Sequence, residues 1–491
     1  MSKDKEPQIK PSTLLSSNFP FQPTAGQSDF FLKMDRFLSL SSEIKPTFVL
    51  RGYAGTGKTS VISAVVKSLP RLSMRSLLLA PTGRAAKVMS NYSGRPAYTI
   101  HKIIYKPKGE DGSLSGGFIL QKNYYKDTIF IIDESSMLAD DGGMSGNLLG
   151  DLIQFVFYGE RNRLILVGDT AQLPPVGSDY SPALDAGYLL RHFRLEADQI
   201  ELTEVMRQKL ESGILFNATA LRDQLKLEKP EIRISTKSFN DTFKMTGERL
   251  EDGLRYAYNK YGTENTTIVT RSNKSAVQYN QYIRRVIHFF EDEISSGDLL
   301  MIVKNNYTYM AESDRVNFLA NGDMAEVMKI RNFEEFYGFR FATLELRLLD
   351  YPEEPHFEAK VILDTLHSPS PSLTRDQYRE LYRQVSEDYA DIASKAERMG
   401  LIKKDPFLNA LQIKFAYALT CHKAQGGQWK AVFVDQGYLP AEQVDRDFTR
   451  WLYTAITRAT DELYLLNFDQ SFFFKTKKEG DSEEESIEDQ N

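Results

Sequence analysis

The sequence predicts an α/β protein with two αβ units, a hairpin inserted in the first unit and a small β-barrel inserted in the second. Apolar strand-like runs followed by helical apolar spacing recur over residues 46–210 and again from residue 266 onward. A glycine-rich loop joins the first such run to its helix. Between residues 297 and 363, short β-rich segments are separated by turns with no helical pattern among them, which is typical of a small barrel.

These patterns divide the chain into expected segments. They are a flexible lead-in over 1–18, a first αβ domain over 19–210 with a hairpin at about 105–123, a second αβ domain over 211–296 and 364–470, an inserted β domain over 297–363, and an acidic disordered tail over 471–491.

Composition excludes several classes of protein. The chain has 491 residues, of which 41% are hydrophobic, and no run approaches the roughly 18 apolar residues of a membrane helix. The N-terminus has no apolar stretch of the signal-peptide type. A single cysteine, Cys421, excludes an internal disulfide framework and fits a reducing compartment. We therefore expect a cytoplasmic protein with no membrane partner.

The net charge of −6 is concentrated at one end of the chain. Residues 479–491 carry seven acidic side chains and no basic one, so removing them gives −6 + 7 = +1. A near-neutral body can still hold a local basic groove, and overall charge therefore does not decide whether the chain binds nucleic acid.

The stretch Arg51–Ser60 matches the phosphate-loop pattern G-x-x-x-x-G-K-[ST] in full. A short apolar run, Pro46–Leu50, precedes it, and helical spacing follows it from Val61. In this arrangement backbone N–H groups and a helix N-terminus hold phosphate oxygens. The alternative is a glycine-rich turn that matches by chance, but the context favours a nucleoside triphosphate site. We expect nucleotide contacts from Gly52, Ala54, Gly55, Thr56, Gly57, Lys58, Thr59 and Ser60, with Lys58 on the β- and γ-phosphates and Thr59 on Mg²⁺.

Upstream, Thr24 and Gln27 have the spacing of an N-terminal capping box. Gln27 could instead bind the adenine edge through its amide, but the spacing alone favours the cap.

Two further strand ends carry polar groups. Residues 76–80 form an apolar strand that ends in Pro81-Thr82-Gly83-Arg84, where a polyanion could lie at the carboxyl edge of a sheet; a capped surface helix is the alternative. Residues 128–132 form a further apolar strand, and Asp133 and Glu134 follow it directly. In a phosphate-loop protein, Asp133 can hold Mg²⁺ and Glu134 can orient and deprotonate the attacking water, and the alternative is a solvated strand-to-helix cap.

Two later stretches complete the candidate nucleotide site. Residues 168–177 form a loop in which the neutral amide of Gln172 could sense the γ-phosphate. In residues 201–208, Arg207 could reach a transition-state phosphate or form a salt bridge with Glu204.

Turn-forming residues dominate Tyr105–Asn123, which predicts a protruding hairpin with Phe118 near its tip. Residues 113–117 (S-L-S-G-G) imitate the signature of ABC-type ATPases, but the following Phe118 breaks that pattern and we treat the match as accidental.

Read together, these motifs resemble those of superfamily 1 helicases of the RecD/Dda type, which move 5′→3′. The motifs appear in family order through most of the chain. They are Thr24–Gln27 (Q), Gly52–Thr59 (I), Ala80–Lys87 (Ia), Thr99–His101 (Ib), Asp133–Met137 (II), Gly168–Pro174 (III), Leu202–Gln208 (IV), Tyr417–Gly426 (V) and Tyr453–Ala459 (VI).

The resemblance implies two RecA-like P-loop motor domains that hold ATP and Mg²⁺ between them, a duplex-splitting pin at the hairpin and an SH3-like insertion at the β-rich stretch. The resemblance favours a contact between Gln27 and the adenine base more than the spacing alone does. It also adds Gly426 to the nucleotide site. It implies catalytic roles for Lys58, Asp133, Glu134, Gln172, Arg207 and Arg458. It implies strand contacts from Pro81, Thr82, Arg84, Thr99, His101, Phe118, Thr420, His422 and Lys423; for His422, a buried structural histidine is the alternative.

The expected function is that of an ATP-dependent DNA helicase that translocates 5′→3′ on a single strand and unwinds duplex. Its expected partners are single-stranded and tailed duplex DNA, with repair or replication proteins as further partners, and we expect a monomer. The sequence lacks the long N-terminal domain of RecD, so we expect no exonuclease-complex role. The rival interpretations are a P-loop ATPase of another class and an ATP-regulated nucleic-acid-binding protein without unwinding activity.

Overall fold

The computed structural model describes residues 9–107, 118–140, 147–205, 211–237, 239–310, 318–440 and 444–474. Among these residues, no helix has the length and apolar character needed to cross a membrane. Arg207 and residues 475–491 of the expected acidic tail lie outside the described residues. Residues 471–474 of that expected tail are described, and the burial of Phe472 and Phe473 corrects the expectation of disorder over these four residues.

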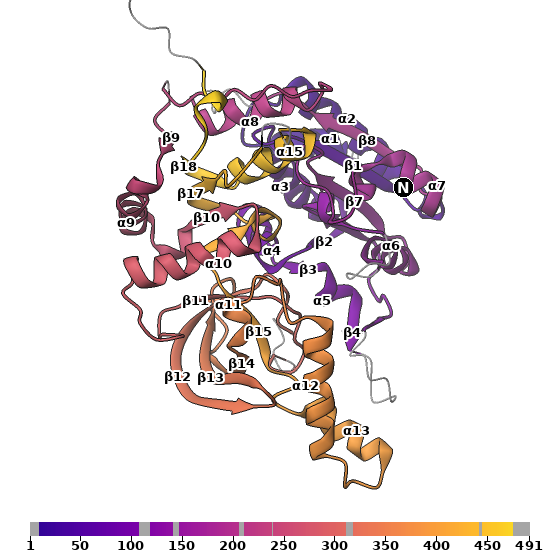
Figure 1. Ribbon diagram of the computed structural model, residues 1–491. Coiled ribbons are helices and arrows are strands. Elements are labelled where there is room, and N and C mark those ends of the chain that lie inside the picture. Colours follow the sequence, from indigo (N-terminus) through magenta and orange to yellow (C-terminus); the bar gives the residue numbers. More distant parts are fainter. Residues whose placement is uncertain are drawn as a thin grey trace, which may run out of the picture.

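A six-stranded parallel sheet forms the core of the first αβ unit, which we call the first sheet domain (Figure 1). Its strand order is β3-β2-β6-β7-β1-β8. The strands are β1 (Thr47–Gly52), β2 (Arg75–Ala80), β3 (Ala97–Thr99), β6 (Thr128–Ile132), β7 (Arg163–Gly168) and β8 (Ala197–Leu202). The helices are α1 (Pro11–Asn18), α2 (Ala25–Ser39), α3 (Lys58–Ser68), α4 (Gly83–Ser93), α5 (Ile100–Ile104), α6 (Leu148–Tyr158) and α7 (Ala186–Phe193).

Alternate residues of these strands enter two separate cores, as the period of two in a strand requires. In β1, Phe48 and Leu50 pack with helices α2 and α3, whereas Val49 packs on the opposite face with α5 and α6. The sheet is therefore covered by helices on both faces. Parallel strands with helices on both faces present their carboxyl ends at one edge, and this edge carries the phosphate loop.

The residues before Phe19 are not a flexible lead-in, which corrects the expectation for residues 1–18 over the part that is described. Helix α1 begins at Pro11 and buries Leu14 and Leu15. The Ser12 amide and hydroxyl both donate to the Asp35 carboxylate, at 2.7 Å each. This helix is stabilised by contacts with α2 and α3, which local composition does not reveal.

The expected hairpin is present as an antiparallel pair, β4 (Tyr105–Pro107) and β5 (Phe118–Leu120). Phe118 lies in β5 opposite Pro107 and not at the tip of the hairpin. Residues 108–117 and the Phe118 side chain lie outside what the structure describes.

The second αβ unit, which we call the second sheet domain, has a five-stranded parallel sheet with the order β16-β10-β17-β18-β9. Its strands are β9 (Thr242–Met245), β10 (Thr266–Thr270), β16 (Ala418–Thr420), β17 (Trp429–Asp435) and β18 (Ala459–Leu466). Its helices are α8 (Gly213–Gln224), α9 (Leu250–Tyr261), α10 (Asn273–Tyr282), α14 (Cys421–Ala424) and α15 (Arg446–Ile456).

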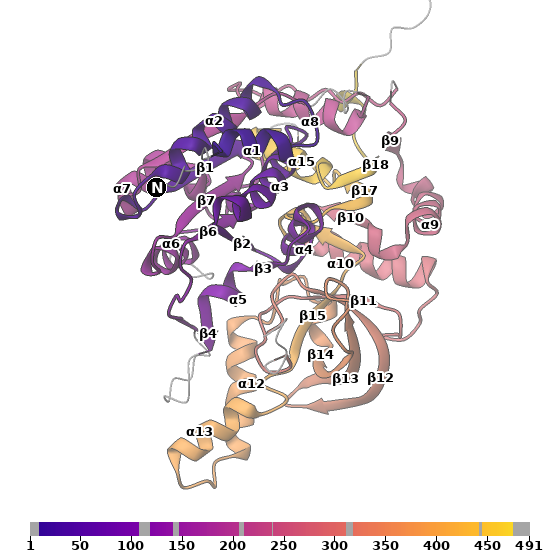
Figure 2. The ribbon, with the colours of Figure 1, turned by 180° about the vertical axis from the view of Figure 1, so that it is seen from behind.

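A closed five-stranded barrel lies between α10 and β16 in the sequence, as expected for the SH3-like insertion, and lies below both sheet domains in Figures 1 and 2. Its strands are β11 (Leu299–Ile302), β12 (Met324–Phe336), β13 (Phe339–Leu348), β14 (Phe357–Ile362) and β15 (Leu411–Phe415). The short α11 (Asp364–His367) follows β14, and α12 (Arg375–Asp388) and α13 (Lys395–Lys404) precede β15.

The fifth strand corrects the predicted end of the insertion at residue 363. β15 pairs with both β11 and β14 and so closes the barrel. Leu381 and Val385 of α12 pack with Phe341 of the barrel. The inserted unit therefore extends to β15, and α12 and α13 belong to it.

Candidate nucleotide and nucleic-acid site

The phosphate loop connects β1 to α3 in the expected geometry. Gly55 and Gly57 have φ values of +77° and +83°, in the left-handed region that glycine adopts readily. A Cβ on Gly52 would lie 2.9 Å from Thr56 Oγ1 and 3.0 Å from Lys58 Cγ. The loop therefore needs glycine at these positions to adopt this conformation.

Lys58, the first residue of α3, folds back over this loop. Its Nζ donates to the carbonyl oxygens of Gly52 at 2.6 Å and Tyr53 at 3.0 Å, and lies 3.9 Å from Asp169 Oδ2. In this structure, carbonyl oxygens of the loop that is expected to bind phosphates therefore accept hydrogen bonds from Lys58, the residue that is expected to neutralise those phosphates. Thr59 and Ser60 occupy the next two positions of the helix, and Thr59 is exposed.

Gln27 acts as the cap that its spacing predicts. Its backbone N–H donates to Thr24 Oγ1 at 3.3 Å, its Oε1 accepts from the Thr24 N–H at 3.0 Å, and its Nε2 donates to the Thr56 carbonyl at 3.0 Å. The residue is fully buried. It therefore connects α2 to the phosphate loop, and its contact with adenine stays a prediction.

Asp133 and Glu134 follow β6 at the same edge of the sheet. Asp133 Oδ1 accepts from the Glu134 N–H at 2.9 Å, and its Oδ2 accepts from the Tyr92 hydroxyl at 2.8 Å. Glu134 has φ +51°, a left-handed conformation that is uncommon for a non-glycine residue and occurs at functional sites. Burial raises the pKa of the Glu134 carboxyl, and the charge of Arg458 opposes that rise.

Arg458 comes from the second sheet domain, directly after α15, and reaches this carboxylate. Its Nη1 lies 3.8 Å from Glu134 Oε1 and donates to the Gly427 carbonyl at 3.2 Å, while its Nε donates to the Thr454 carbonyl at 3.0 Å. The residue is buried. The structure therefore brings together the predicted base and one of the two predicted arginines; the other, Arg207, is not among the described residues.

Tyr453 of α15 makes a second connection across the two domains. Its hydroxyl donates to Asp169 Oδ2 at 2.7 Å and accepts from the Ala54 N–H of the phosphate loop at 2.9 Å. Burial, followed by the charge of Asp169, raises the pKa of Tyr453 well above its ordinary value, so the phenol keeps its proton.

The loop after β7 also faces the second sheet domain. Gln172 is buried, and its Oε1 has no hydrogen-bond partner among the described residues. The neighbouring Leu173 accepts from Gln425 Nε2 at 2.7 Å and donates to Thr454 Oγ1 at 2.9 Å. Gly426, at φ +75°, packs so closely on Ala85 that a Cβ would lie 2.8 Å from the alanine Cβ. A buried amide oxygen with no partner, at the junction of two domains, fits a group that senses a ligand.

The residues present fit a magnesium nucleotide. Mg²⁺ prefers oxygen ligands and is bound through one or two protein groups together with phosphate oxygens. The Asp133 carboxylate and the Thr59 hydroxyl provide such oxygens at the ends of β6 and of the phosphate loop.

The predicted strand contacts of the first sheet domain lie at two helix starts. Thr82 caps α4 by accepting from the Ala85 N–H at 3.2 Å, directly after Pro81, and Thr99 caps α5 by accepting from the Lys102 N–H at 3.3 Å. Burial lowers the pKa of His101 to about 4, so this imidazole is neutral at neutral pH.

Arg84 faces the second sheet domain. Its guanidinium stacks on Trp429 at 4.0 Å and donates to the Gln428 carbonyl at 3.2 Å. In this arrangement Arg84 contacts protein, so its role on a strand stays a prediction.

The predicted contacts of the second sheet domain lie around α14. His422 is exposed, which disagrees with the alternative of a buried structural histidine. Burial lowers the pKa of Lys423 to about 8, and burial together with the charge of Lys423 lowers that of Lys414 to about 8. The two lysines line a small pocket with Thr420. Lys414 was not predicted because it lies on the barrel strand β15.

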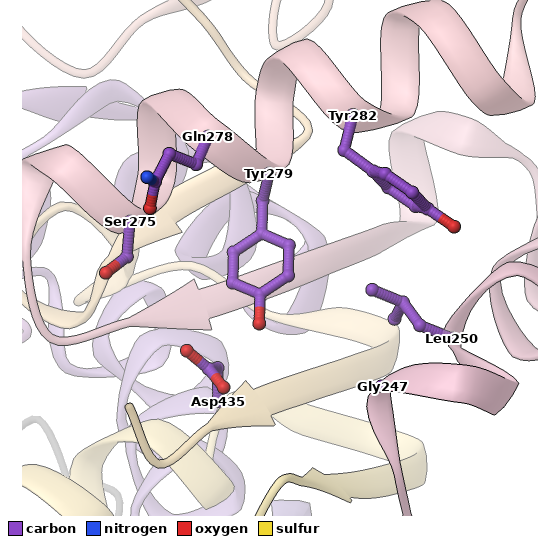
Figure 3. A pocket seen from close by; sticks show the side chains of 7 residues that line it. All are labelled: Gly247, Leu250, Ser275, Gln278, Tyr279, Tyr282 and Asp435. Carbon is purple, nitrogen blue, oxygen red and sulfur yellow. The ribbon is translucent and has the colours of Figure 1, made fainter. Parts of the chain in front are cut away.

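A separate cavity of about 310 Å³ lies in the second sheet domain between α9, α10 and the end of β17 (Figure 3). Its lining includes Tyr279, whose hydroxyl points toward Asp435, and Tyr282. Burial raises the pKa of Asp435. None of the predicted site residues lines this cavity.

Sequence reasoning missed Tyr92, Asp169, Tyr453 and Trp429 as contributors to the site. Asp169 and Tyr453 stand inside motifs III and VI, so their place in those motifs was an available signal. Tyr92 and Trp429 lie outside the motifs and contact the site only through the fold.

Two family models match parts of the chain. A family model described as an AAA domain matches residues 39–230, and a model described as a UvrD-like helicase C-terminal domain matches residues 415–466. Among solved structures, a Bacteroides Pif1 helicase in complex with ADP-AlF3 and ssDNA aligns with a TM-score of 0.47 and 13% identity, covering 93% of this chain and 95% of that one.

Curated relatives include two named helicases. The ATP-dependent RecD2 DNA helicase of Deinococcus radiodurans is 25% identical over 85% of this chain and 46% of its own length. The ATP-dependent DNA helicase dda of Enterobacteria phage T4 is 22% identical over 90% of this chain and 98% of its own length. The chain thus spans less than half of RecD2 and nearly all of Dda. By its phosphate loop, its two parallel sheets and its matches to the two family models and the two named helicases, the chain is similar to superfamily 1 helicases of the RecD/Dda type.

Proposed function

We propose that the chain is an ATP-dependent DNA helicase that hydrolyses ATP between its two sheet domains, moves 5′→3′ along single-stranded DNA and unwinds duplex. One observation carries the proposal most directly. Tyr453 and Arg458 of the second sheet domain contact Ala54, Asp169 and Glu134 of the first. A nucleotide site shared by two domains changes when the domains move relative to one another, and this is the property that a motor needs.

Each residue at this edge has a distinct task. The N–H groups of the phosphate loop and the Lys58 ammonium bind the phosphates. Thr59 and Asp133 would hold Mg²⁺, which when bound adds positive charge to the phosphates. The amide of Gln172, whose Oε1 has no partner among the described residues, would sense the γ-phosphate, and the adjacent Leu173 bonds to the second sheet domain.

Glu134 is the general base. Its pKa is raised by burial, which makes the carboxylate a better acceptor for the proton of the attacking water. The positive charge of Arg458, 3.8 Å away, opposes that rise in the pKa of Glu134. The same guanidinium can stabilise charge on the transferred phosphoryl group, a contribution worth about 10³–10⁵ in rate for arginines that complete such sites.

We assign the grip on the strand to both domains. Thr82, Thr99 and His101 act from the first sheet domain, and Thr420, His422 and Lys423 act from the second. Closure around ATP and reopening after hydrolysis change the distance between the two grips, so that the strand is passed from one to the other. Stacking of bases on aromatic side chains adds about 1–3 kcal/mol per base without sequence preference.

We propose a domain organisation that follows the sheets. The first motor domain holds the six-stranded sheet and the second holds the five-stranded sheet. The insertion runs from about residue 297 through β15, which ends at Phe415. We further propose that the β4–β5 hairpin acts as a pin. The proposal also includes a monomeric state, a cytoplasmic location, and repair or replication proteins as partners.

ATPase assays with and without a single-stranded oligonucleotide test this function. The motor should be stimulated strongly by the strand, and Glu134→Gln serves as the inactive control with its shape preserved. Turnover that ignores the strand would indicate a P-loop ATPase of another class. Strand binding without any turnover would indicate a regulated binding protein. Arg207→Ala should reduce stimulated turnover while leaving the strand bound.

A further inference from the structure

Helix α4 contacts the second sheet domain, the barrel unit and Asp133 at the candidate nucleotide site. At its N-terminal end, Arg84 stacks on Trp429 and donates to Gln428 of the second sheet domain. One turn further along, Lys87 Nζ donates to the Leu349 carbonyl of the barrel unit at 2.6 Å and lies 3.5 Å from Asp350 Oδ1. A displacement of the second sheet domain or of the barrel unit therefore acts on α4 directly.

The start of α4 is packed tightly enough to transmit such a displacement. Gly426 approaches Ala85 so closely that any side chain would collide, and the Asp323 carboxylate of the barrel unit lies against Gly83 with equally little space. Close-packed contacts of this kind move together because there is no void to absorb a shift.

The other end of α4 carries Tyr92, which contacts the candidate metal ligand. Its hydroxyl donates to Asp133 Oδ2 at 2.8 Å, and its ring packs against the core beneath the sheet. Arg84 and Tyr92 are eight residues apart, which is about 12 Å along a helix that rises 1.5 Å per residue. A rigid helix of two turns thus joins the contact with the second sheet domain to the carboxylate of Asp133.

The chemistry of this contact suits a positioning role. The Tyr92 hydroxyl and the Glu134 N–H fix one oxygen each of the Asp133 carboxylate. A carboxylate held at both oxygens has one orientation, and hydrogen bonds of this outer kind tune metal affinity.

We propose that Tyr92 is a positioning residue for Asp133, and that α4 makes the affinity of this site for a divalent cation depend on the nucleic-acid strand. The inference rests on the proposed function, because the strand is expected to engage the start of α4. The inference goes beyond the proposed function by assigning a role to Tyr92, which lies outside every motif, and by linking strand binding to the affinity for the divalent cation.

The test measures metal binding and does not depend on turnover. Mn²⁺ is titrated into the full chain with ADP present, and free Mn²⁺ is followed by electron paramagnetic resonance, with and without a thymidine oligonucleotide. Tyr92→Phe removes only the hydroxyl. Tyr188→Phe is the matched control, because the Tyr188 hydroxyl donates to the Asp140 carboxylate at 2.5 Å in the same domain.

We expect Tyr92→Phe to weaken Mn²⁺ binding about 10-fold or more, the range found when outer-shell partners of metal ligands are removed. The oligonucleotide should change Mn²⁺ affinity in the unmodified protein and in Tyr188→Phe, and should have little effect in Tyr92→Phe. Melting temperatures confirm that both variants are folded.

Mn²⁺ affinity within twofold of the unmodified value in folded Tyr92→Phe would overturn the positioning role. An oligonucleotide effect of normal size in a variant with weakened Mn²⁺ binding would overturn the link through α4. These failures are distinct from failure of the proposed function, which would appear in the unmodified protein as ATP turnover that the strand does not stimulate.

Discussion

The Tyr453 hydroxyl is the contact between the two sheet domains whose removal should be easiest to interpret. Tyr453→Phe keeps the ring and deletes one oxygen, which donates to Asp169 at 2.7 Å and accepts from the Ala54 N–H at 2.9 Å. Asp169 is almost fully buried, with 1% of its surface exposed, so water cannot readily replace the lost donor.

The expected size of the effect follows from these two bonds. A hydrogen bond to a charged group contributes about 1.5–3 kcal/mol and a neutral one about 0.5–1.5 kcal/mol, so closure of the domains should lose about 2–4.5 kcal/mol. At 1.4 kcal/mol per factor of ten, this loss shifts the balance between closed and open arrangements about 30- to 1,600-fold toward the open one.

Single-molecule energy transfer between the two sheet domains measures that balance. Leu32 of α2 and Tyr256 of α9 are exposed and can be replaced by cysteine for dye attachment, while the native Cys421 is buried. The low-transfer population should rise in Tyr453→Phe without added nucleotide. Distributions that superimpose on those of the unmodified protein would show that this hydroxyl does not hold the domains together.

Four further substitutions separate the assigned roles. Lys58→Ala should weaken ATP binding as well as turnover, whereas Glu134→Gln should bind ATP and hardly hydrolyse it; near-normal turnover in Glu134→Gln would remove it from the role of base. Arg458→Ala should reduce strand-stimulated turnover by about 10³-fold or more while strand affinity is retained, and the reverse pattern would make it a strand contact. Phe118→Ala should slow unwinding while single-strand-stimulated ATPase persists if the side chain is a wedge; a lower melting temperature with loss of both activities would indicate packing instead.

The sequence predicted the central strands of both sheets and missed their edges for a physical reason. β1, β2, β6 and β7 are buried on both faces and read as continuous apolar runs. The edge strand β8 reads A-D-Q-I-E-L, in which only two residues are buried, and periodicity alone does not distinguish it from a loop.

The barrel was predicted from its first four strands, but its last strand was not. β15 reads L-Q-I-K-F and is separated from β14 by α12 and α13, so that only the three-dimensional pairing assigns it to the barrel. α1 was missed for a related reason, because its eight residues are helical through contacts with α2 and α3.

The residues of the candidate site were likewise predictable only where their chemistry is local in the sequence. Residues within one loop, such as Lys58 and Thr59, or within one strand end, such as Asp133 and Glu134, could be recognised because their chemistry is contiguous in the sequence. Tyr92 could not be recognised, since its contact with Asp133 spans 41 residues and depends on how α4 packs on the sheet.

Unwinding of duplexes that carry a single-stranded tail tests the central claim most directly. Two otherwise identical substrates, one with a 5′ tail and one with a 3′ tail, are incubated with the chain and ATP, and strand separation is followed over time with Glu134→Gln as the inactive control. A motor that moves 5′→3′ should separate the 5′-tailed duplex and leave the 3′-tailed duplex largely intact. Separation of the 3′-tailed duplex alone would contradict the assigned direction, and strand-stimulated ATP hydrolysis with neither duplex separated would contradict the helicase assignment.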